Sequence, residues 1–526
     1  MKDCWLKPDV CFEPLIFNWY AWANLVSPMT SGAILNKQYL NILRSYLTHP
    51  ELHQKACENP KLIGGPYVNL TGNKTIEVSN LCADILAKND AVSKLAIAID
   101  NLSRRLELEV GFSLESIYAE IAEPLLGCVE LVYDMYHRAN IRIIEPMIYR
   151  QYYNCSGQAI LLSQIASDAR PFVLSTPRIP AVKDMLLPIP FSDKVIDHLV
   201  QSRRTPCQLE RLRDMLPISE QDQQKFANFF TNTPPDSIHT KYREDKLRIR
   251  YFGHACVLIE TKHSAILIDP FINYHSKPDQ NCFNYHDLPD NIDYVLITHA
   301  HQDHVNLETL LQIRQQIKTI VVPENNSGFL ADPSLKLMLK HIGFESVISI
   351  KELEKIALLD GVITGIPFLG EHGDLNIHSK LAYHLKIANK SILFAVDSNN
   401  IDNTLYKKLA SLMSPVDMLF IGMECQGAPM SWSYGPLFTK QIQRDFDQSR
   451  RLSGSNCDKA WLMVRDLQCA EVVIYAMGQE PWLRHVMGLE YTADSPQLIE
   501  ADKLLEKCRQ SSIKALKPFA RAEWTY

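Results

Sequence analysis

Four side chains of metal-binding type stand within six residues in the middle of the chain. His299, His301, Asp303 and His304 follow directly after the apolar stretch 294–297. Histidines two residues apart in an extended turn can direct their rings to one side, so His299 and His301 can hold one ion. Asp303 and His304 can then hold a second. Imidazole and carboxylate are ligands of zinc, iron and manganese, and the spacing predicts two ions roughly 3.5–4 Å apart.

Further acidic and imidazole side chains stand at comparable places elsewhere in this half of the chain. Asp269 and Asp397 each come directly after a predicted strand. The loop PFLGEHGDL offers Glu371 and His372 side by side, and the residues alone leave both open as ligands. A hard carboxylate oxygen suits iron, which favours Glu371.

Other polar and aromatic side chains near these motifs have weaker claims to a role. Glu424 follows an apolar strand, and we interpret it as an acid that orients a ligand or relays a proton, with a solvated carboxylate as the equal alternative. For His254, in the sequence GHAC, a hydrogen bond within a hairpin is favoured over contact with the site. Trp432 and Tyr434 are expected either to wall a pocket or to pack in the core. A small basic cluster, expected on a solvated face, consists of Arg444, Arg450 and Arg451.

The residues that must position these groups lie in the second half of the chain. Residues 247–526 carry short β-branched and aliphatic stretches separated by turns, which predict strands. A helix is expected over 307–317 with Asn306 as its cap. Strands that alternate with occasional helices indicate an α/β layered domain. The predicted strands are 247–252, 256–260, 265–268, 294–297, 319–322, 391–396, 417–421 and 471–476.

The first half of the chain has a different pattern. Residues 1–230 are expected to form a mainly helical domain, because apolar residues recur at helical steps over 85–106 and again over 114–132, the latter with Ser113 as a cap. Residues 231–246 are polar, contain a Pro-Pro pair and are interpreted as a linker.

Composition excludes several functional classes. The 526 residues carry a formal net charge of −6, which argues against a nucleic-acid-coating protein. Thirteen cysteines without a C-x-x-C pair suit a reducing cytoplasm, and no apolar stretch is long enough to predict a membrane span. Neither G-x-G-x-x-G nor G-x-x-x-x-G-K-[ST] occurs, so no nucleotide-binding fold is indicated.

The motif HAHQDH, together with Asp269 and Asp397, resembles the metallo-β-lactamase superfamily. That resemblance covers residues 247–526 and implies an αββα sandwich preceded by the helical α+β N-terminal domain. Hydrolases of the superfamily normally supply a further His from the middle loop and another from a late strand end. Here the middle loop has Glu371 beside His372, and the late strand end has Met477. His485 lies several residues beyond that strand, so the second ion is expected to lack its usual His.

These departures resemble a narrower group, the diiron β-hydroxylases of the chloramphenicol-biosynthesis type. The resemblance rests on GHAC, ITHAHQDH, PFLGEHGDL, FAVDSNNI, FIGME, DQSRRLSGSN and YAMGQEPW, and in the N-terminal part on EPLIFNWYAW and GGPYV. It implies that His299, His301 and Glu371 bind one iron. Asp303 and His304 would bind the second, and Asp397 would bridge them.

The resemblance also implies a function. We expect a non-haem diiron monooxygenase that uses O2 to hydroxylate the β-carbon of an amino acid held as a thioester on a carrier domain of a non-ribosomal peptide synthetase. Its cofactors would be two iron ions, oxo-bridged when oxidised, with an external electron donor or reductase because the chain carries no recognisable redox cofactor site. The N-terminal domain would assist homodimer formation or carrier docking. The alternative is a dizinc hydrolase of a thioester, lactone or phosphodiester that uses His372 in place of Glu371.

Overall fold

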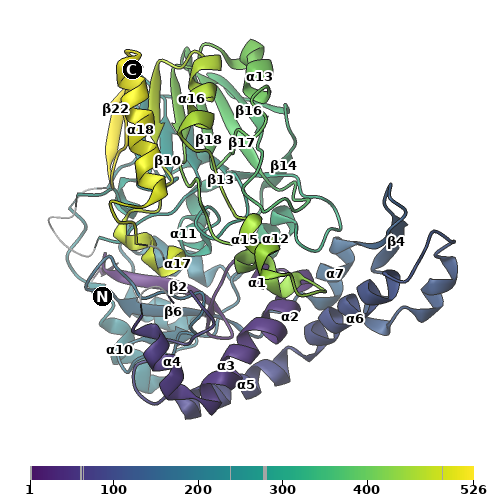
Figure 1. The fold of residues 1–526 in the computed structure, drawn as a ribbon. Helices are drawn as coiled ribbons and strands as arrows, with labels where there is room; N and C mark the ends of the chain where they lie inside the picture. Colours follow the sequence, from purple (N-terminus) through teal and green to yellow (C-terminus); the bar gives the residue numbers. More distant parts are fainter. Residues whose placement is uncertain (1–2, 60–61, 63, 237, 276–280, 489) are drawn as a thin grey trace.

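The computed structural model describes residues 3–59, 62, 64–236, 238–275, 281–488 and 490–526. Within these residues the C-terminal half forms two seven-stranded sheets that pack face to face (Figure 1). The first sheet has the order β14-β13-β12-β11-β10-β9-β22 and the second has the order β15-β16-β17-β18-β19-β20-β21. The strands of the first sheet are β9 (Arg248–Tyr251), β10 (Val257–Glu260), β11 (Ala265–Ile268), β12 (Ile292–Leu296), β13 (Ile317–Pro323), β14 (Val347–Ile350) and β22 (Ala522–Thr525). Those of the second are β15 (Lys355–Ala357), β16 (Gly361–Pro367), β17 (Leu381–Ile387), β18 (Lys390–Val396), β19 (Met418–Ile421), β20 (Glu471–Ile474) and β21 (Lys514–Leu516).

Helices cover the outer faces of both sheets, which explains why the central strands are apolar on both sides. In β18, six of the seven residues are buried. The inner faces meet in a core that includes Tyr383, Phe394 and Phe420. Helices α13 (Leu405–Met413), α16 (Cys457–Asp466) and α18 (Pro496–Gln510) pack on the second sheet, while α11 (Leu307–Gln312) and α12 (Leu335–His341) lie over the first. The predicted αββα sandwich is confirmed, and every predicted strand overlaps an observed one.

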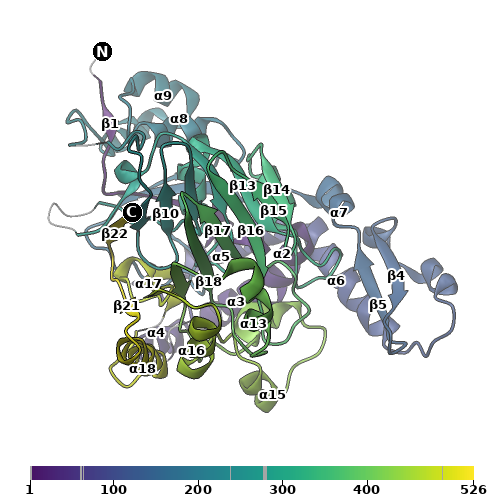
Figure 2. The same cartoon turned by 90° about the horizontal axis from the view of Figure 1, so that it is seen from above.

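The N-terminal part combines helices with a small sheet, as expected for a mainly helical α+β domain. Its antiparallel sheet has the order β3-β2-β6-β7, with β2 (Val10–Ile16) and β6 (Gln158–Gln164) at its centre. Figure 2 shows α6, β4 and β5 projecting away from the sandwich. The remaining elements named here are β3 (Trp19–Tyr20), β7 (Met185–Leu187), β4 (Val129–Tyr133), β5 (Ala139–Ile143), α2 (Pro28–Ile34), α3 (Leu40–Thr48), α5 (Thr75–Lys88), α6 (Asp90–Leu106) and α7 (Glu145–Tyr152).

The two halves share one hydrophobic core and a buried ionic cluster. Apolar side chains of β2 and α2 belong to the same cluster as those of β12 and α11. At the contact, the Arg170 guanidinium faces the Cys11 thiol and the carboxylates of Glu13 and Glu308. Its Nη1 lies 2.9 Å from Sγ of Cys11, 3.3 Å from Oε1 of Glu13 and 3.1 Å from Oε2 of Glu308. Arg178 also binds Glu13, at 3.0 Å. The arginine thus occupies the space that the acidic groups enclose and ties β2 to α11.

The prediction of a helix over 114–132 is wrong. Residues Glu115–Glu120 and Glu123–Leu125 form 3₁₀ turns, and the segment ends in β4, which pairs with β5. Pro124 cannot donate a backbone hydrogen bond, and Gly127 has φ of +71°. Both residues oppose a continuous helix, although the apolar spacing matches one. Ser113 therefore caps no α-helix.

Two other helices begin or end at unexpected places. The pattern over 85–106 divides at Asn89, between α5 and α6. The helix expected over 307–317 begins as predicted, with the Asn306 side chain accepting from the Thr309 N–H at 2.7 Å, but it ends at Gln312. The next residues are held elsewhere, because the buried Arg314 guanidinium donates to Asp197 and to backbone carbonyls.

The stretch interpreted as a linker packs against the sandwich. Residues 232–236 and 238–246 contain no helix or strand, and residue 237 lies outside the described residues. Nε2 of His239 lies 2.8 Å from the Glu260 carboxylate on β10, and the Arg248 guanidinium stacks on the Tyr242 ring at 4.3 Å.

Candidate metal centre

The predicted ligands come from loops at one end of the sandwich. The loop after β12 carries His299, His301, Asp303 and His304, and Asp397 directly follows β18. Carboxyl ends of parallel strands meet at the same edge of a sheet, and the two sheets bring their edges together here. Glu371 comes from the loop between β16 and β17. All are buried or nearly so.

The first group consists of His299, His301 and Glu371. Their ligand atoms lie within 4.8 Å of one another. Nδ1 of His301 is 3.2 Å from Oε2 of Glu371. Two atoms that bind one ion at roughly 2.0–2.2 Å and at right angles are about 3 Å apart, so this separation is that of neighbouring ligands.

The second group consists of Asp303, His304 and Asp397. Nε2 of His304 lies 3.3 Å from Oδ2 of Asp303 and 3.0 Å from Oδ2 of Asp397. The same Oδ2 of Asp397 is 3.7 Å from Nε2 of His299, which belongs to the first group. Asp397 therefore lies between the two groups, the position that a bridging carboxylate requires.

Several of these buried atoms have no hydrogen-bond partner. They are Nε2 of His299, Nε2 of His304, Oε2 of Glu371 and Oδ1 of Asp397. A buried polar atom without a partner is costly, and such atoms are rare in folded proteins. Their convergence on a common space is what bound cations would explain, and a donor set of three imidazoles and three carboxylates fits iron. The residues present therefore fit a two-metal centre.

Asp269 contacts the candidate ligand His304 from outside the two groups. Its Oδ2 lies 2.8 Å from Nδ1 of His304, and it accepts from the Thr298 hydroxyl at 2.6 Å, while Oδ1 accepts from the Thr298 N–H at 2.8 Å. A proton held on Nδ1 leaves Nε2 of His304 free to face Asp397. The sequence pattern marked Asp269 as an acidic residue of the site without indicating this role.

The middle loop brings both of its candidates to the centre, in different positions. Glu371 joins the two histidines of the first group, and its φ is +69°, in the left-handed region. His372 stacks on the His301 ring at 4.7 Å, and its Nδ1 lies 3.3 Å from the Gly370 carbonyl. Burial, followed by the charge of His301, lowers the pKa of His372 well below its usual value. This geometry favours Glu371 as the ligand.

Met477 and His485, the two residues at or beyond the late strand end, both lie outside the centre. The Met477 sulfur accepts from the Met423 N–H at 3.3 Å. His485 is buried at the contact with the N-terminal half, where Nδ1 lies 2.8 Å from the Trp482 carbonyl and Nε2 lies 2.6 Å from Nη2 of Arg170.

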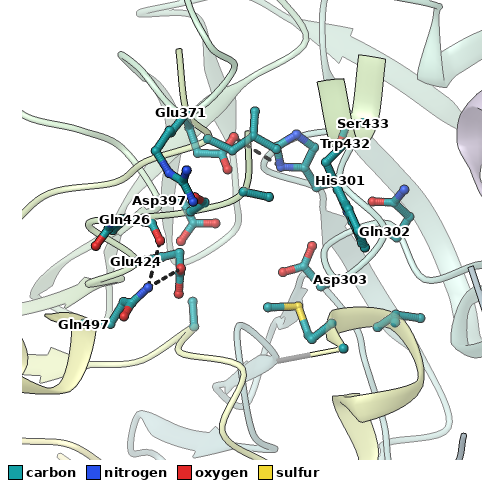
Figure 3. Close-up of a pocket in the computed structure, with 18 of the residues that line it drawn as sticks. His301, Gln302, Asp303, Glu371, Asp397, Glu424, Gln426, Trp432, Ser433 and Gln497 are labelled. Carbon is teal, nitrogen blue, oxygen red and sulfur yellow. Dashed lines mark hydrogen bonds and ion pairs between the residues drawn. The ribbon is translucent and has the colours of Figure 1, made fainter. Parts of the chain in front are cut away.

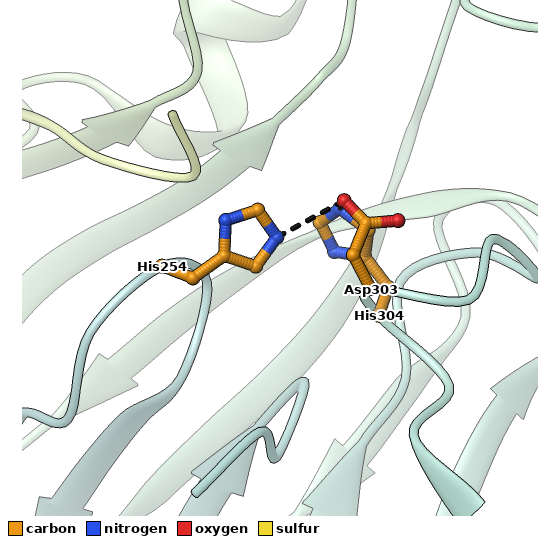
Figure 4. A group of neighbouring side chains, drawn as sticks. All are labelled: His254, Asp303 and His304. Carbon is orange, nitrogen blue, oxygen red and sulfur yellow. Dashed lines mark hydrogen bonds and ion pairs between the residues drawn. The ribbon is translucent and has the colours of Figure 1, made fainter. Parts of the chain in front are cut away.

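The expectation that His254 bonds within its own hairpin is wrong. Its Nε2 lies 3.1 Å from Oδ2 of Asp303 (Figure 4), and its Nδ1 lies 3.2 Å from the Gly478 nitrogen. Both partners are distant in sequence, which is why the local pattern does not predict the contacts.

A cavity of about 400 Å³ opens onto the two groups (Figure 3). Asp303, Glu371 and Asp397 line it together with Glu424 and Trp432. Of the two alternatives for Trp432, a pocket wall and core packing, the structure shows the pocket wall. The volume lies within the range of small-molecule sites.

Glu424 lies in this cavity as a partly buried acid. It accepts hydrogen bonds from the Tyr491 hydroxyl and, at 3.0 Å, from Nε2 of Gln497. Burial raises the pKa of Glu424 to about 7, helped by the negative charges of Asp397 and Asp303 and opposed by the two hydrogen bonds. Such an acid can hold or release a proton near neutral pH.

The remaining candidates separate into different roles. The Tyr434 hydroxyl lies 3.3 Å from Nε2 of His301, a contact with a candidate ligand that the sequence pattern did not indicate. Arg450 and Arg451 donate to the carbonyls of Gly373 and Gly427, at 2.8 and 2.7 Å, so they fasten loops around the cavity. Arg444 is exposed on α15 (Arg444–Ser449).

Comparisons with known proteins agree with this architecture. A family model described as the diiron non-heme beta-hydroxylase N-terminal domain matches residues 5–234, and a beta-lactamase superfamily domain matches residues 248–424. The chain is 35% identical over 514 residues to the 4-amino-L-phenylalanyl-[CmlP-peptidyl-carrier-protein] 3-hydroxylase of Streptomyces venezuelae, covering 95% of each chain.

Solved structures lead to the same family. The crystal structure of CmlA, a diiron beta-hydroxylase from Streptomyces venezuelae, superposes with a TM-score of 0.94 at 33% identity and full coverage of both chains. By contrast, the match to a metal-dependent hydrolase of Anoxybacillus flavithermus spans 97 residues, 18% of this chain and 40% of that protein, at 30% identity. The chain therefore belongs to the diiron non-heme beta-hydroxylases.

Proposed function

We propose that this enzyme uses O2 to hydroxylate the β-carbon of an amino acid tethered as a thioester to the carrier domain of a non-ribosomal peptide synthetase. The observation that carries the proposal is the full-length similarity to a hydroxylase whose name specifies an aminoacyl group on a peptidyl carrier protein. The cavity beside the carboxylate-rich centre supports it, since a tethered aminoacyl group needs a site that is open on one side.

We assign His299, His301 and Glu371 to the first iron and Asp303 and His304 to the second, with Asp397 bridging them. The contacts between these groups and their unpartnered buried atoms support the assignment. Bound iron supplies the change of oxidation state that O2 activation requires and that zinc lacks. The chain's contribution is to hold the ions close together at the end of a buried sandwich.

Glu424 is proposed to act from the wall of the cavity, outside the ligand set. Tyr491 and Gln497 hold its carboxyl group in place. With a pKa of about 7 it can donate a proton to, or accept one from, a group bound in the cavity. Trp432 contributes apolar surface that can exclude water from the reacting carbon.

We further propose an external reductase as electron donor, a homodimer, and a cytoplasmic location. The proposed division of the chain is an N-terminal domain over 1–230 for dimerisation or carrier docking, a linker over 231–246, and a catalytic domain over 247–526. The thirteen free thiols suit a reducing compartment. Among the helices formed by described residues, none is both long and apolar enough to cross a bilayer.

The test begins with elemental analysis of enzyme purified from iron-supplied cells, where we expect about two irons per chain. The enzyme is then incubated with aminoacyl carrier domains, a reductant and isotopically labelled O2, and the released amino acid is analysed by mass spectrometry. One labelled oxygen at the β-carbon supports the proposal. About two zincs per chain, thioester hydrolysis and no O2 uptake would establish the dizinc hydrolase instead.

A further inference from the structure

His254 stands at the centre of a hydrogen-bonded arrangement that joins three distant parts of the catalytic half. It lies in the turn between β9 and β10 and is 1% exposed. Its N–H donates to Oε1 of Glu480 at 2.9 Å, and its carbonyl accepts from the Ala476 N–H at 3.0 Å. Both partners come from the segment after β20. The backbone of His254 is therefore fixed by residues more than 200 positions away.

The backbone at His254 is also held in a conformation that few residues adopt. Its φ is +52°, in the left-handed region, where non-glycine residues are uncommon. Such conformations are unfavourable and persist where the surroundings enforce them, often at functional sites. At this φ the ring points toward Asp303, away from the hairpin that carries it (Figure 4).

The hydrogen bonds determine which ring nitrogen carries the proton. The Gly478 N–H donates to Nδ1 of His254 at 3.2 Å, so Nδ1 is the acceptor nitrogen of a neutral imidazole. Nε2 then carries the hydrogen and donates to Oδ2 of Asp303 at 3.1 Å. A nitrogen that carries hydrogen has no free lone pair for a metal. This tautomer excludes His254 as a ligand, although it lies with Asp303 and His304 in a group of metal-binding types.

We infer that His254 is a positioning residue for the second metal ion, fixing the Asp303 carboxylate by a hydrogen bond from Nε2. Oδ2 of Asp303 also faces Nε2 of His304 at 3.3 Å, and a carboxylate oxygen has lone pairs for both an ion and a hydrogen-bond donor. On the opposite side, Asp269 orients His304 in the same manner. Asp303 and His304, the two proposed ligands that bind the second ion alone, are thus each held by a residue outside the metal centre. The inference rests on the proposed two-metal centre.

The substitution His254→Asn removes the side-chain hydrogen bond to Asp303 and keeps the one from the Gly478 N–H. Asn tolerates a left-handed φ, and its Oδ1 can accept from the Gly478 N–H in place of Nδ1, but the side chain is too short to reach Asp303. His254→Gln is the rescue variant, because its longer side chain carries an N–H donor to the position of Nε2. His384→Asn is the matched control, since His384 is a buried histidine that bonds to Ser391 away from the site.

The measurement is the number of iron ions per chain after equilibration with increasing chelator, followed by elemental analysis and the optical spectrum. We expect His254→Asn to bind one of its two ions about 10–100-fold more weakly, the usual effect of removing an outer partner of a ligand. His254→Gln and His384→Asn should retain both ions like the unmodified enzyme. Melting temperatures of the metal-free proteins check that each variant folds.

Two outcomes would overturn the inference. Retention of both ions by His254→Asn would mean that His254 only stabilises the turn between β9 and β10. Loss of an ion by His254→Gln would mean that His254 is itself a ligand. Should His254→Asn not fold, His254→Gly takes its place under the same criterion, because glycine adopts the left-handed φ freely and has no side chain to reach Asp303. Because the readout is metal retention, it can be repeated with zinc. Failure of the proposed hydroxylase function is therefore distinguishable from failure of this inference.

Discussion

Replacement of Arg170 by Met tests how the two halves of the chain are held together. Arg170 is 9% exposed, and the side chains of Glu13 and Glu308 are 1% and 3% exposed. Removing one partner of a buried ion pair costs about 3–5 kcal/mol, because the remaining charge is left uncompensated.

The structure places the expected loss at the lower end of that range. Glu13 keeps Arg178 as a partner, so Glu308 alone loses its ion pair. Glu308 also keeps two hydrogen bonds, from the hydroxyls of Tyr20 at 2.8 Å and Tyr274 at 2.7 Å. We therefore expect Arg170→Met to lower the free energy of unfolding by about 3 kcal/mol.

The assay is urea denaturation of the metal-free protein. Adding Glu308→Gln to Arg170→Met should recover part of the loss, since it removes the uncompensated charge. The control is Arg142→Met, whose pair with Glu130 is about half exposed and should change the free energy of unfolding by less than about 1 kcal/mol. A loss at Arg170 no larger than that of the control, or a further loss on adding Glu308→Gln, would refute the reasoning.

Three further predictions concern the metal centre and the effect of pH. Glu371→Ala should lose iron from one site and abolish hydroxylation, whereas His372→Ala should bind iron almost normally; elemental analysis decides, and the reverse result would make His372 the ligand. Asp397→Ala should lower the occupancy of both sites, and two ions retained per chain would contradict its bridging position. Burial raises the pKa of Glu145 to about 7, from a usual value of 4.5. The folded chain therefore binds more protons than the unfolded chain between these values, and its stability falls as the pH rises through this window, by at most about 3 kcal/mol. Glu145→Gln should remove this contribution in melting experiments at pH 5 and 7.5 and leave that of Glu424, whose pKa burial also raises to about 7. A dependence that is unchanged in Glu145→Gln would assign it to other groups.

The sequence predicts the candidate ligands of the motif because they lie close together after a recognisable strand. His299, His301, Asp303 and His304 form one motif, and Asp397 follows a strongly apolar strand, so local pattern and fold agree. The sandwich is likewise predictable, since its core strands are apolar on both faces.

The outer partners of the ligands are not predictable in this way. Asp269 contacts His304 across 35 residues and His254 contacts Asp303 across 49, and nothing in the local sequence of either residue indicates the pairing. The incorrect helix at 114–132 has a different cause. Apolar spacing alone cannot distinguish a helix from 3₁₀ turns and a strand, and Pro124 with Gly127 decides against the helix.

The core shared by the two halves has a consequence for synthesis of the chain on the ribosome. The first 230 residues emerge before α11 and the strands on which they pack. Apolar side chains such as Phe12 and Leu35 therefore stay exposed until Leu258 and Leu310, which belong to the same buried cluster, have been synthesised. A truncated catalytic half would expose the same surface permanently and would leave Glu308 without Arg170. Expression of the catalytic half alone, from a chain divided between the regions that the two family models match, would therefore yield an aggregation-prone fragment.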